Sequence, residues 1–485
     1  MREPWPRVTW AALAVVTAAA VALRLPYLGN QSLWYDETFT RAIVTAPSIA
    51  DVWHGVKATE GSPPLYYLVT WGWAKLFGIH SDAALRATSG IAGAACAPVA
   101  FAALRRFTGD RVALASAALL AASPMLVWYA LDARAYSLLV LLSLLSLWTL
   151  ALVLEGPTAS RRRWLAWALA AAAAVWTHYF AAFLVAAEVA VLLWRLPAAR
   201  RRTLGWSALA AALAAPLVAV LAAQTDARTD HIGSLALGSR LEQTGRQLAM
   251  GPNVPRAWLE AAGIVLAVAG LAAGAWSARR EPRLRVPVAI AAIAVALPLV
   301  LSVTDVEDRL LARNMLIALP CLAALAAAGL LRLRAVPLAL FLALGVATSV
   351  WVEGDWRYQN ADWRGAARAL PARAERDLIA VFPRLDRQVA QLYLGRTYAA
   401  DRIQGDVWAV VAPARIDRRD LAPVRTEPAV PPGYARAATR THRGFRLVEL
   451  RAVGPAATLT QDALGRDILG EVPALLVPQP GGGAP

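Results

Sequence analysis

The stretch Leu33–Thr40 carries two adjacent carboxylates, Asp36 and Glu37, among aromatic residues. Aromatic neighbours remove water from a carboxylate, which makes it a stronger base toward a hydroxyl group. The first long apolar run ends near Leu28. If that run spans a membrane, the pair stands at the bilayer surface on its far side. Two solvated loop acids are the alternative, and the aromatic setting favours an acid–base role.

Cationic side chains stand where a phosphate could be bound. Arg134 follows Asp132 in a short turn between two apolar runs. Its guanidinium could fork onto a phosphate, or the two residues could form an ion pair that ties two helix ends. Arg309 and Arg313 are four positions apart in the charged cluster 305–313, so we expect them to share one helix face as a clamp. Charges beside a membrane core usually have a purpose, which favours a functional role.

Two further motifs place polar and aromatic residues near the predicted outer surface. In Ser62–Tyr67, two prolines fix an extended turn before an aromatic segment, and a rigid helix start explains them by itself. His178 and Tyr179 stand between two short apolar runs. A histidine at a helix end is more often structural than catalytic, but this one could bind a phosphate or a sugar hydroxyl.

These residues must be positioned by secondary structure, and the composition predicts a bundle of membrane helices. The chain of 485 residues is 58% hydrophobic, has a mean hydropathy of +0.47 and contains 17% charged residues. The charges cluster between apolar runs of about 15 to 20 residues, the pattern of a multi-pass membrane protein. The net charge of +16 does not indicate nucleic acid, because the arginines lie between the runs, where they set orientation.

The expected membrane spans lie near residues 9–28, 87–104, 112–130, 135–154, 164–178, 180–194, 205–223, 257–276, 286–303, 315–331 and 335–352. With the N-terminus inside, every predicted inner loop is rich in arginine, as the positive-inside rule requires. Residues 164–194 are interpreted as a hairpin, because one helix would reach about 46 Å against a hydrocarbon core of about 30 Å. A multi-pass protein of the cytoplasmic (inner) membrane is expected.

The remaining segments are expected outside the bilayer. Because the last expected span ends at residue 352, the chain is divided into residues 1–352, which contain the membrane helices, and residues 353–485. Within the first part, 29–86 forms a long outer loop with helical spacing over 38–52 and an interfacial helix over 65–77. The polar loop 224–256 is a mobile cover or disordered. Residues 353–485 form a small extracytoplasmic α/β domain with a flexible tail. Its expected strands are 378–382, 407–411 and 445–450, and its expected helix is 386–394.

Together the motifs resemble the polytopic glycosyltransferases of the GT-C fold, above all the bacterial relatives of protein O-mannosyltransferases and lipid A aminoarabinose transferase (glycosyltransferase family 39-like). The Asp36-Glu37 pair is similar to the acidic motif in that family's first outer loop, and Ser62–Tyr67 is similar to its Pro-Pro-Leu segment. Ser123–Ser137, Thr177–Phe180 and Ala361–Gly365 resemble further counterparts. The order and the topology of these motifs carry the resemblance.

The resemblance implies transfer of a sugar from a polyprenyl-phosphate-linked donor to a hydroxyl of a glycan, lipid or protein acceptor, with inversion, outside the membrane. The acidic pair is then catalytic, with Asp36 rather than Glu37 as the general base. Many relatives have His or Lys just before the two prolines, where this chain has Ser62, so Lys57 or Arg134 could supply that phosphate contact. The implied donor-phosphate ligands are Arg134, Arg309, Arg313, Lys57 and His178, and the implied substrate contacts are Tyr35, Pro64, Tyr66, Tyr67, Asp132 and Tyr179.

Other functions fit parts of this pattern. No cofactor is required and no metal ligand is assigned, although the acidic cluster near 305–308 could hold a divalent metal. A lipid or sugar transporter or flippase without transferase activity is the main alternative, which intramembrane charges and broken helices would support. The polar residues instead gather at one membrane face. A non-catalytic assembly or sensor protein on the same frame is a third interpretation.

Overall fold

The computed structural model describes residues 7–224, 236–304, 310–375, 377–398, 403–413, 425–454, 458–467 and 469–478. It divides into two compact units. The helical unit comprises Met1–Leu28 and Thr40–Trp351, and the α/β unit comprises Gly29–Phe39 and Val352–Pro485. The segment that carries the acidic pair therefore folds with the C-terminal part of the chain, whereas the sequence grouped it with the membrane helices.

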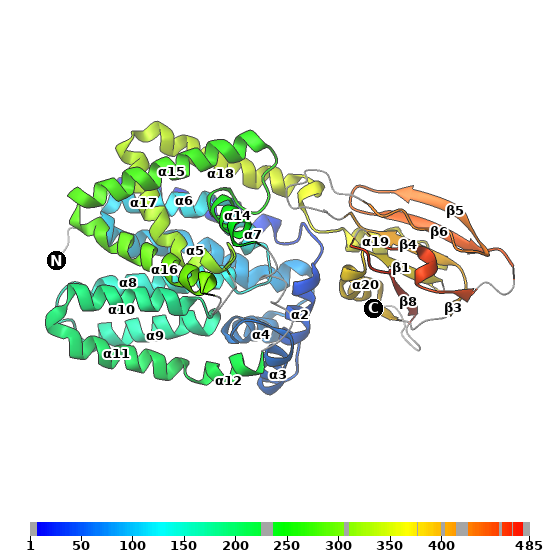
Figure 1. Cartoon of the computed structure of the whole chain (residues 1–485), viewed down its shortest axis with the longest axis horizontal. Helices are drawn as coiled ribbons and strands as arrows, with labels where there is room; N and C mark the ends of the chain where they lie inside the picture. The colour runs from blue at the N-terminus through cyan, green and yellow to red at the C-terminus, as the bar shows by residue number, and fades with distance from the viewer. Residues whose placement is uncertain are drawn as a thin grey trace. The chain divides into compact units, whose positions relative to one another are not determined.

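The helical unit is built from helices of very different lengths (Figure 1). Their bounds are α1 Arg7–Ala22, α2 Tyr35–Val44, α3 Ile49–Thr59, α4 Leu65–Phe77, α5 Asp82–Thr108, α6 Asp110–Ala122, α7 Pro124–Ala130, α8 Tyr136–Val153, α9 Arg161–Thr177, α10 Ala181–Arg195, α11 Arg200–Ala214, α12 Pro216–Ala223, α14 Leu237–Met250, α15 Ala257–Arg280, α16 Arg285–Val303, α17 Leu319–Arg332 and α18 Ala335–Gly354. Helix α2 begins in the α/β unit and ends in the helical unit, and α18 begins in the helical unit and ends in the α/β unit.

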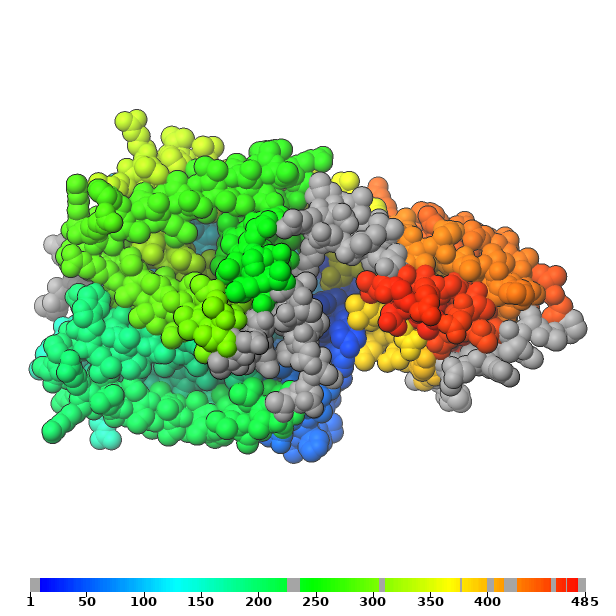
Figure 2. Space-filling view, viewed as in Figure 1, coloured from blue at the N-terminus to red at the C-terminus, as the bar shows by residue number. Residues whose placement is uncertain are grey.

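Among the described residues, seven helical segments are long and apolar enough to cross a membrane, and two bent pairs could raise that number to nine. The chain is thus a multi-pass membrane protein. The seven are Thr9–Tyr27, Asp82–Thr108, Tyr136–Val153, Ala257–Arg280, Pro282–Val303, Asn314–Arg332 and Ala335–Gly354. Helix α15 forms part of the visible surface of the helical unit, in green (Figure 2). Its exposed side chains include Val265, Val268 and Trp276, as expected of a lipid-facing helix.

Proline interrupts two of the segments that the sequence predicts to be continuous. Helices α6 and α7 bend by 55° where Pro124 follows Ser123, so 112–130 is not one straight span. Helix α11 ends at Ala214 and α12 begins at Pro216, which divides 205–223. Proline lacks a backbone N–H and clashes with the preceding turn, but it is well suited to the first position of a new helix.

Other predictions of local structure have mixed outcomes. The hairpin within 164–194 is confirmed, because α9 ends at Thr177 and α10 begins at Ala181. The helix over 65–77 is confirmed as α4. The helical spacing over 38–52 covers parts of two helices, since α2 ends at Val44 and α3 begins at Ile49. The predicted loop 224–256 contains α14, and its residues 225–235 lie outside the described part of the chain.

Close helix packing forms the core of the helical unit. Helix α5 packs against α6 and α8, α8 packs against α9, and α15 packs against α17. In the last pair a Cβ atom added at Gly329 would lie 1.9 Å from the Gly270 carbonyl oxygen, and one added at Gly274 would lie 2.0 Å from the Leu325 carbonyl oxygen. Small residues at such positions let membrane helices approach closely where no hydrophobic driving force acts between them.

Glu188 places a carboxyl group inside this packed bundle. It is fully buried on α10. Its Oε2 accepts hydrogen bonds from Ser146 Oγ on α8 at 2.7 Å and from Trp167 Nε1 on α9 at 2.8 Å. One oxygen atom thus connects three helices, because a polar group at this depth must be satisfied within the protein.

The α/β unit contains a six-stranded sheet in the order β2-β8-β1-β4-β6-β5. Strands β1 and β4 are parallel, and every other neighbouring pair is antiparallel. The strands are β1 Leu378–Phe382, β2 Arg396–Tyr398, β4 Val407–Val411, β5 Tyr434–Thr441, β6 Arg446–Ala452 and β8 Ala474–Pro478, and a two-stranded sheet pairs β3 Ile403–Gln404 with β7 Thr458–Leu459. The three strands and the helix expected here are confirmed to within two residues at each end.

Two helices cover one face of this sheet. These are α19 Trp363–Ala369 and α20 Arg387–Leu394, whose buried side chains join those of β1, β4 and β6 in one apolar cluster. Alternate residues of the same strands form a second cluster on the opposite face, as the period of two along a strand requires. Trp363 anchors α19, since its side chain is 2% exposed and its Nε1 donates to Asp386 Oδ2 at 3.0 Å.

The role of Glu188 in packing can be tested by substitution. Glu188→Gln keeps an oxygen acceptor for Ser146 and Trp167, so we expect the free energy of unfolding to change by less than about 1 kcal/mol. Glu188→Leu leaves both donors without an acceptor and should cost about 2–4 kcal/mol. SDS titration of the detergent-solubilised protein measures both changes. Ser143→Ala is the matched control on α8, because the buried Ser143 Oγ has no hydrogen-bond partner among the described residues.

Candidate functional site

The two acids of the pair have different surroundings. Both lie in the first turn of α2, where the helix dipole stabilises negative charge. Glu37 is fully buried, and its Oε2 accepts the backbone N–H of Trp34 at 3.2 Å. This is the helix-capping contact expected of a glutamate at the third helical position. Asp36 is only partly buried and points elsewhere, because adjacent helical residues face different directions.

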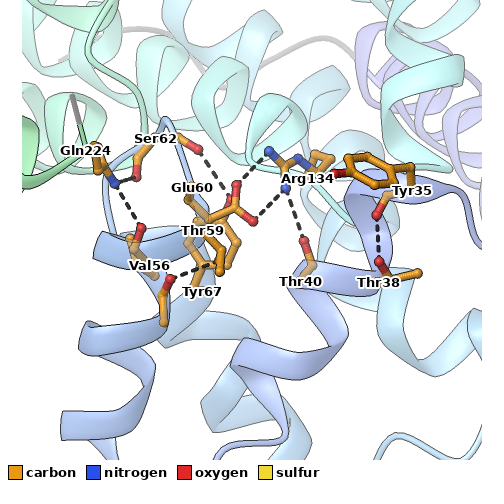
Figure 3. A network of polar contacts seen from close by, with 11 residues as sticks. Tyr35, Thr38, Thr40, Val56, Thr59, Glu60, Ser62, Tyr67, Arg134 and Gln224 are labelled. Atoms are coloured by element: carbon orange, nitrogen blue, oxygen red, sulfur yellow. Dashed lines mark hydrogen bonds and ion pairs between the residues drawn. The ribbon is translucent and has the colours of Figure 1, made fainter. Parts of the chain in front are cut away.

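Tyr35 opens the same helix. Its ring packs edge-on against Phe39 with 5.1 Å between ring centroids. Its carbonyl oxygen accepts the Thr38 hydroxyl at 2.7 Å (Figure 3). The aromatic setting that the sequence indicated is thus present beside the acids.

Arg134 forms a buried ion pair in the helical unit (Figure 3). It lies in the turn between α7 and α8. Its guanidinium group binds Glu60 through both terminal nitrogens, Nη1 to Oε1 at 2.9 Å and Nη2 to Oε2 at 2.8 Å. The two side chains are 11% and 2% exposed. Nη1 also donates to Thr40 Oγ1 at 3.4 Å. This fork geometry fixes the orientation of the guanidinium group.

Two buried tyrosines of α4 support the same region. Tyr66 and Tyr67 are fully buried. The Ser89 hydroxyl donates to the Arg134 carbonyl oxygen at 3.1 Å, so the Tyr66 hydroxyl donates to Ser89 Oγ, 2.9 Å away. Burial raises the pKa of Tyr66 to about 12, and burial likewise raises the pKa of Tyr67, against the opposing effect of the Arg134 charge. Both phenols therefore stay neutral and act as hydrogen-bonding groups.

Gln224 ties the Pro-Pro segment to the end of α12. Its Nε2 donates to the carbonyl oxygens of Ser62 at 2.9 Å and Val56 at 3.2 Å (Figure 3). Its Oε1 accepts the Tyr179 hydroxyl at 2.8 Å. Pro64, which is buried, is the residue before α4. One amide thus fixes the backbone that enters this helix and the tyrosine of the α9–α10 hairpin.

His178 lies in the linker between α9 and α10, close to two arginines. Burial, followed by the positive charges of Arg313 and Arg134, lowers the pKa of His178 to about 3. The imidazole is therefore neutral at pH 7. Its Nδ1 accepts the Phe180 N–H at 3.2 Å, which places the proton on Nε2. His178 can accordingly donate one hydrogen bond to a ligand, but it adds no positive charge.

The other expected site residues have more varied positions. Arg313 is half-buried and precedes the 3-10 helix Asn314–Ala318, so it does not lie on the α-helix face that the spacing from Arg309 suggested. Arg309 and the acidic cluster near 305–308 lie outside the described residues. Lys57 lies in the last turn of α3, and Asp132 is buried in the α7–α8 turn.

Glu60 and Gln224 are the residues that the sequence analysis missed. Glu60 stands a few positions before Ser62 and the two prolines. The one clue in the sequence was that Arg134, if buried, would require an acidic partner. Gln224 had no signal, because it stands at the end of an apolar run. Among the described residues, no group of three or more His, Cys, Asp or Glu side chains is placed to hold a metal ion.

Comparison with known proteins supports the resemblance over part of the chain. Residues 61–223, about a third of the 485 residues, match the family model described as Dolichyl-phosphate-mannose-protein mannosyltransferase. This range contains the Pro-Pro-Leu segment, Arg134 and His178, but not the acidic pair. The resemblance to that family is confirmed over this range. A sequence comparison with curated proteins gives no match.

Several solved structures are similar at a low level. ArnT from Cupriavidus metallidurans bound to undecaprenyl phosphate gives a TM-score of 0.46 and 19% identity over 76% of this chain and 67% of that one. The Archaeoglobus fulgidus oligosaccharyltransferase in complex with Zn and sulfate gives 0.43 and 11%, over 79% of this chain and 61% of that one. This chain thus spans about two thirds or less of the length of those proteins. Similarity at this level supports no conclusion about activity.

The Glu60–Arg134 pair can be tested by a double-mutant cycle. Glu60→Gln or Arg134→Met alone leaves a buried charge without its partner and should destabilise the protein by about 3–5 kcal/mol. The double variant should lose less than the sum, with an interaction free energy of at least about 1 kcal/mol. Unfolding in SDS gives the four values, and Lys57→Met controls for loss of a nearby cation. Additive losses would contradict the pairing.

Proposed function

We propose that the protein is a membrane glycosyltransferase of the GT-C type that moves a sugar from a polyprenyl-phosphate-linked donor to an acceptor hydroxyl. One observation carries the proposal. The range that matches the mannosyltransferase family model, 61–223, contains Arg134, whose guanidinium group Glu60 orients through two nitrogens, and His178, whose Nδ1 accepts the Phe180 N–H. An oriented guanidinium group and an imidazole with its proton on Nε2 are suited to a phosphate group.

Arg134 and Arg313 are proposed to bind the donor phosphate, and His178 would add a hydrogen bond from its Nε2. Glu60 holds the Arg134 guanidinium through two nitrogens, and arginine offers five N–H donors in a rigid fork. Glu60 therefore keeps the guanidinium group oriented, and an oriented guanidinium group suits recognition of a phosphate. Lys57 and Arg309 are proposed as additional cations. The polyprenyl tail would lie among the apolar helices.

Asp36 is proposed as the general base of an inverting displacement. Its carboxylate takes the proton of the acceptor hydroxyl as that oxygen bonds to the anomeric carbon. The bond between that carbon and the phosphate oxygen breaks on the opposite side, through a transition state with oxocarbenium character. The lipid phosphate leaves with the electron pair, and the arginines stabilise its growing negative charge. The base and the cations thus act on opposite ends of the reaction.

The other expected substrate residues have supporting roles in this proposal. Tyr35, Asp132 and Tyr179 would contact the sugar or the acceptor. Pro64, Tyr66 and Tyr67 are buried, so they would shape the site from behind. A glycan, a lipid or a protein can supply the acceptor hydroxyl. Transfer of radiolabelled sugar from polyprenyl-phosphate sugars by the purified protein tests the activity, and a transporter or flippase would show no transfer.

We further propose, from the arginine-rich predicted inner loops, that the protein lies in the cytoplasmic membrane with its N-terminus on the cytoplasmic side and residues 353–485 on the outer side. Single cysteines introduced at exposed Arg162 and Arg440 test this. In intact cells an impermeant thiol reagent should label position 440 and leave position 162 unlabelled until the membrane is opened. Labelling at 162 without labelling at 440 would reverse the orientation.

The roles of the two acids are tested separately. Asp36→Asn keeps the shape of the side chain and removes the base, so turnover should fall by roughly 10²–10⁴ while donor binding is unchanged. Glu37→Gln weakens the cap of α2, so it should cost about 0.5–2 kcal/mol of stability and less turnover. Kinetics and SDS unfolding of the purified variants measure the two effects.

The opposite pattern would reassign the base. An active Asp36→Asn together with an inactive, folded Glu37→Gln would make Glu37 the catalytic acid. If both variants transfer sugar normally, the acidic pair has no catalytic role.

A further inference from the structure

The segment before the acidic pair is held by residues far along the chain. Residues 29–34 form neither a helix nor a strand, so their backbone polar groups need other partners. The Gly29 carbonyl oxygen accepts Arg364 Nη2 at 2.9 Å, and the Ser32 carbonyl oxygen accepts Asn360 Nδ2 at 3.3 Å. The Leu33 N–H donates to the Tyr393 hydroxyl at 2.8 Å. These partners lie 328 to 360 positions later in the sequence.

Side chains of the segment make reciprocal bonds. Gln31 Oε1 accepts the backbone N–H of Asn360 at 3.0 Å, and Ser32 Oγ accepts the backbone N–H of Arg364 at 3.1 Å. Ser32 and Leu33 are 2% and 1% exposed. Gln31–Leu33 are therefore buried and each is hydrogen-bonded to a residue far along the chain, unlike an ordinary surface loop.

Two of these partners, Arg364 and Tyr393, stand on helices. Arg364 lies in the first turn of α19, whose N-terminus is capped by Asp362 Oδ1 accepting the Gly365 N–H at 2.8 Å. Tyr393 lies on α20, and both helices pack on one face of the sheet. A functional group is held most precisely when its supports belong to packed secondary structure.

We propose that Arg364, Asn360 and Tyr393 are positioning residues for Asp36, so that the C-terminal α/β part of the chain sets the place of the catalytic acid. The proposal rests on the proposed role of Asp36. Asp36 follows Leu33 by three positions and lies in the first turn of a helix that Glu37 caps on Trp34. Fixing Gly29–Leu33 therefore fixes the start of α2 and the acid on it. The proposed transfer reaction gave the Ala361–Gly365 motif no role. In this proposal its Arg364 helps to position Asp36.

Two variants test the positioning. Tyr393→Phe removes the acceptor of the Leu33 N–H, and Arg364→Gln shortens the side chain that reaches Gly29. Turnover should fall about threefold to tenfold in the first and about tenfold or more in the second, with the KM for the donor unchanged. Hydrogen exchange of residues 29–39 should quicken in the full-length protein, while exchange of β1 stays as in the wild type.

Matched controls use the same substitutions elsewhere in this unit. Tyr398→Phe alters a tyrosine whose hydroxyl bonds to Arg384 and Gln461, and Arg368→Gln alters an exposed arginine of α19. Both should keep normal turnover. Arg364→Lys should recover part of the loss, because lysine keeps a donor near Gly29.

The decisive readout combines each variant with Asp36→Asn. If Tyr393 and Arg364 act through Asp36, their substitution causes no further loss of turnover once the carboxylate is absent. An equal loss in the Asp36→Asn background would overturn the proposal. So would wild-type turnover and exchange in Tyr393→Phe and Arg364→Gln while Asp36→Asn is inactive. Normal turnover of Asp36→Asn would instead refute the base assignment, on which this proposal rests.

Discussion

Burying a polar group costs free energy unless it finds a partner inside the protein, and this constraint shapes both units. In the helical unit the fully buried Arg24 donates to the carbonyl oxygens of Leu120 and Ala121 near the end of α6, where proline stops the helix and leaves such groups without helical donors. Arg134 finds Glu60 by the same rule. In the α/β unit the irregular backbone of Gly29–Leu33 is satisfied by side chains from α19, α20 and the segment before them. Several residues with proposed catalytic or binding roles lie next to these paired polar groups.

The same constraint separates two acids that look equivalent in the sequence. Glu37 meets a structural need, because it satisfies a backbone N–H at the start of α2 and is fully buried. Asp36, one position away, faces another direction and stays partly exposed. A similar division holds for the tyrosines: Tyr66 and Tyr67 are buried supports, whereas Tyr179 reaches Gln224 from the hairpin. In both pairs, burial rather than residue type separates a side chain with a structural contact from one that stays partly exposed.

Much of the fold follows from local patterns. Apolar runs of sufficient length give membrane helices, so α5, α8, α15 and α17 appear where hydropathy places them. The continuous apolar character of 378–382 and 407–411 gives β1 and β4, both fully buried. The bends at Pro124 and Pro216 were readable in principle, since proline cannot continue a helix without losing a hydrogen bond. A hydropathy window averages over such single residues, and it therefore joins two short helices into one span.

The sequence by itself determined the helical membrane frame, the α/β unit after residue 352 and the short polar motifs, because length, hydropathy and turn chemistry act over a few neighbouring residues. Tertiary structure alone decided that Glu60 pairs with Arg134, that Gln224 joins α12 to the first loop, and that Gly29–Phe39 folds with the C-terminal part of the chain. These pairings join residues 74 to 360 positions apart. No local pattern encodes them, since a buried donor selects its acceptor only when packing has brought the two together.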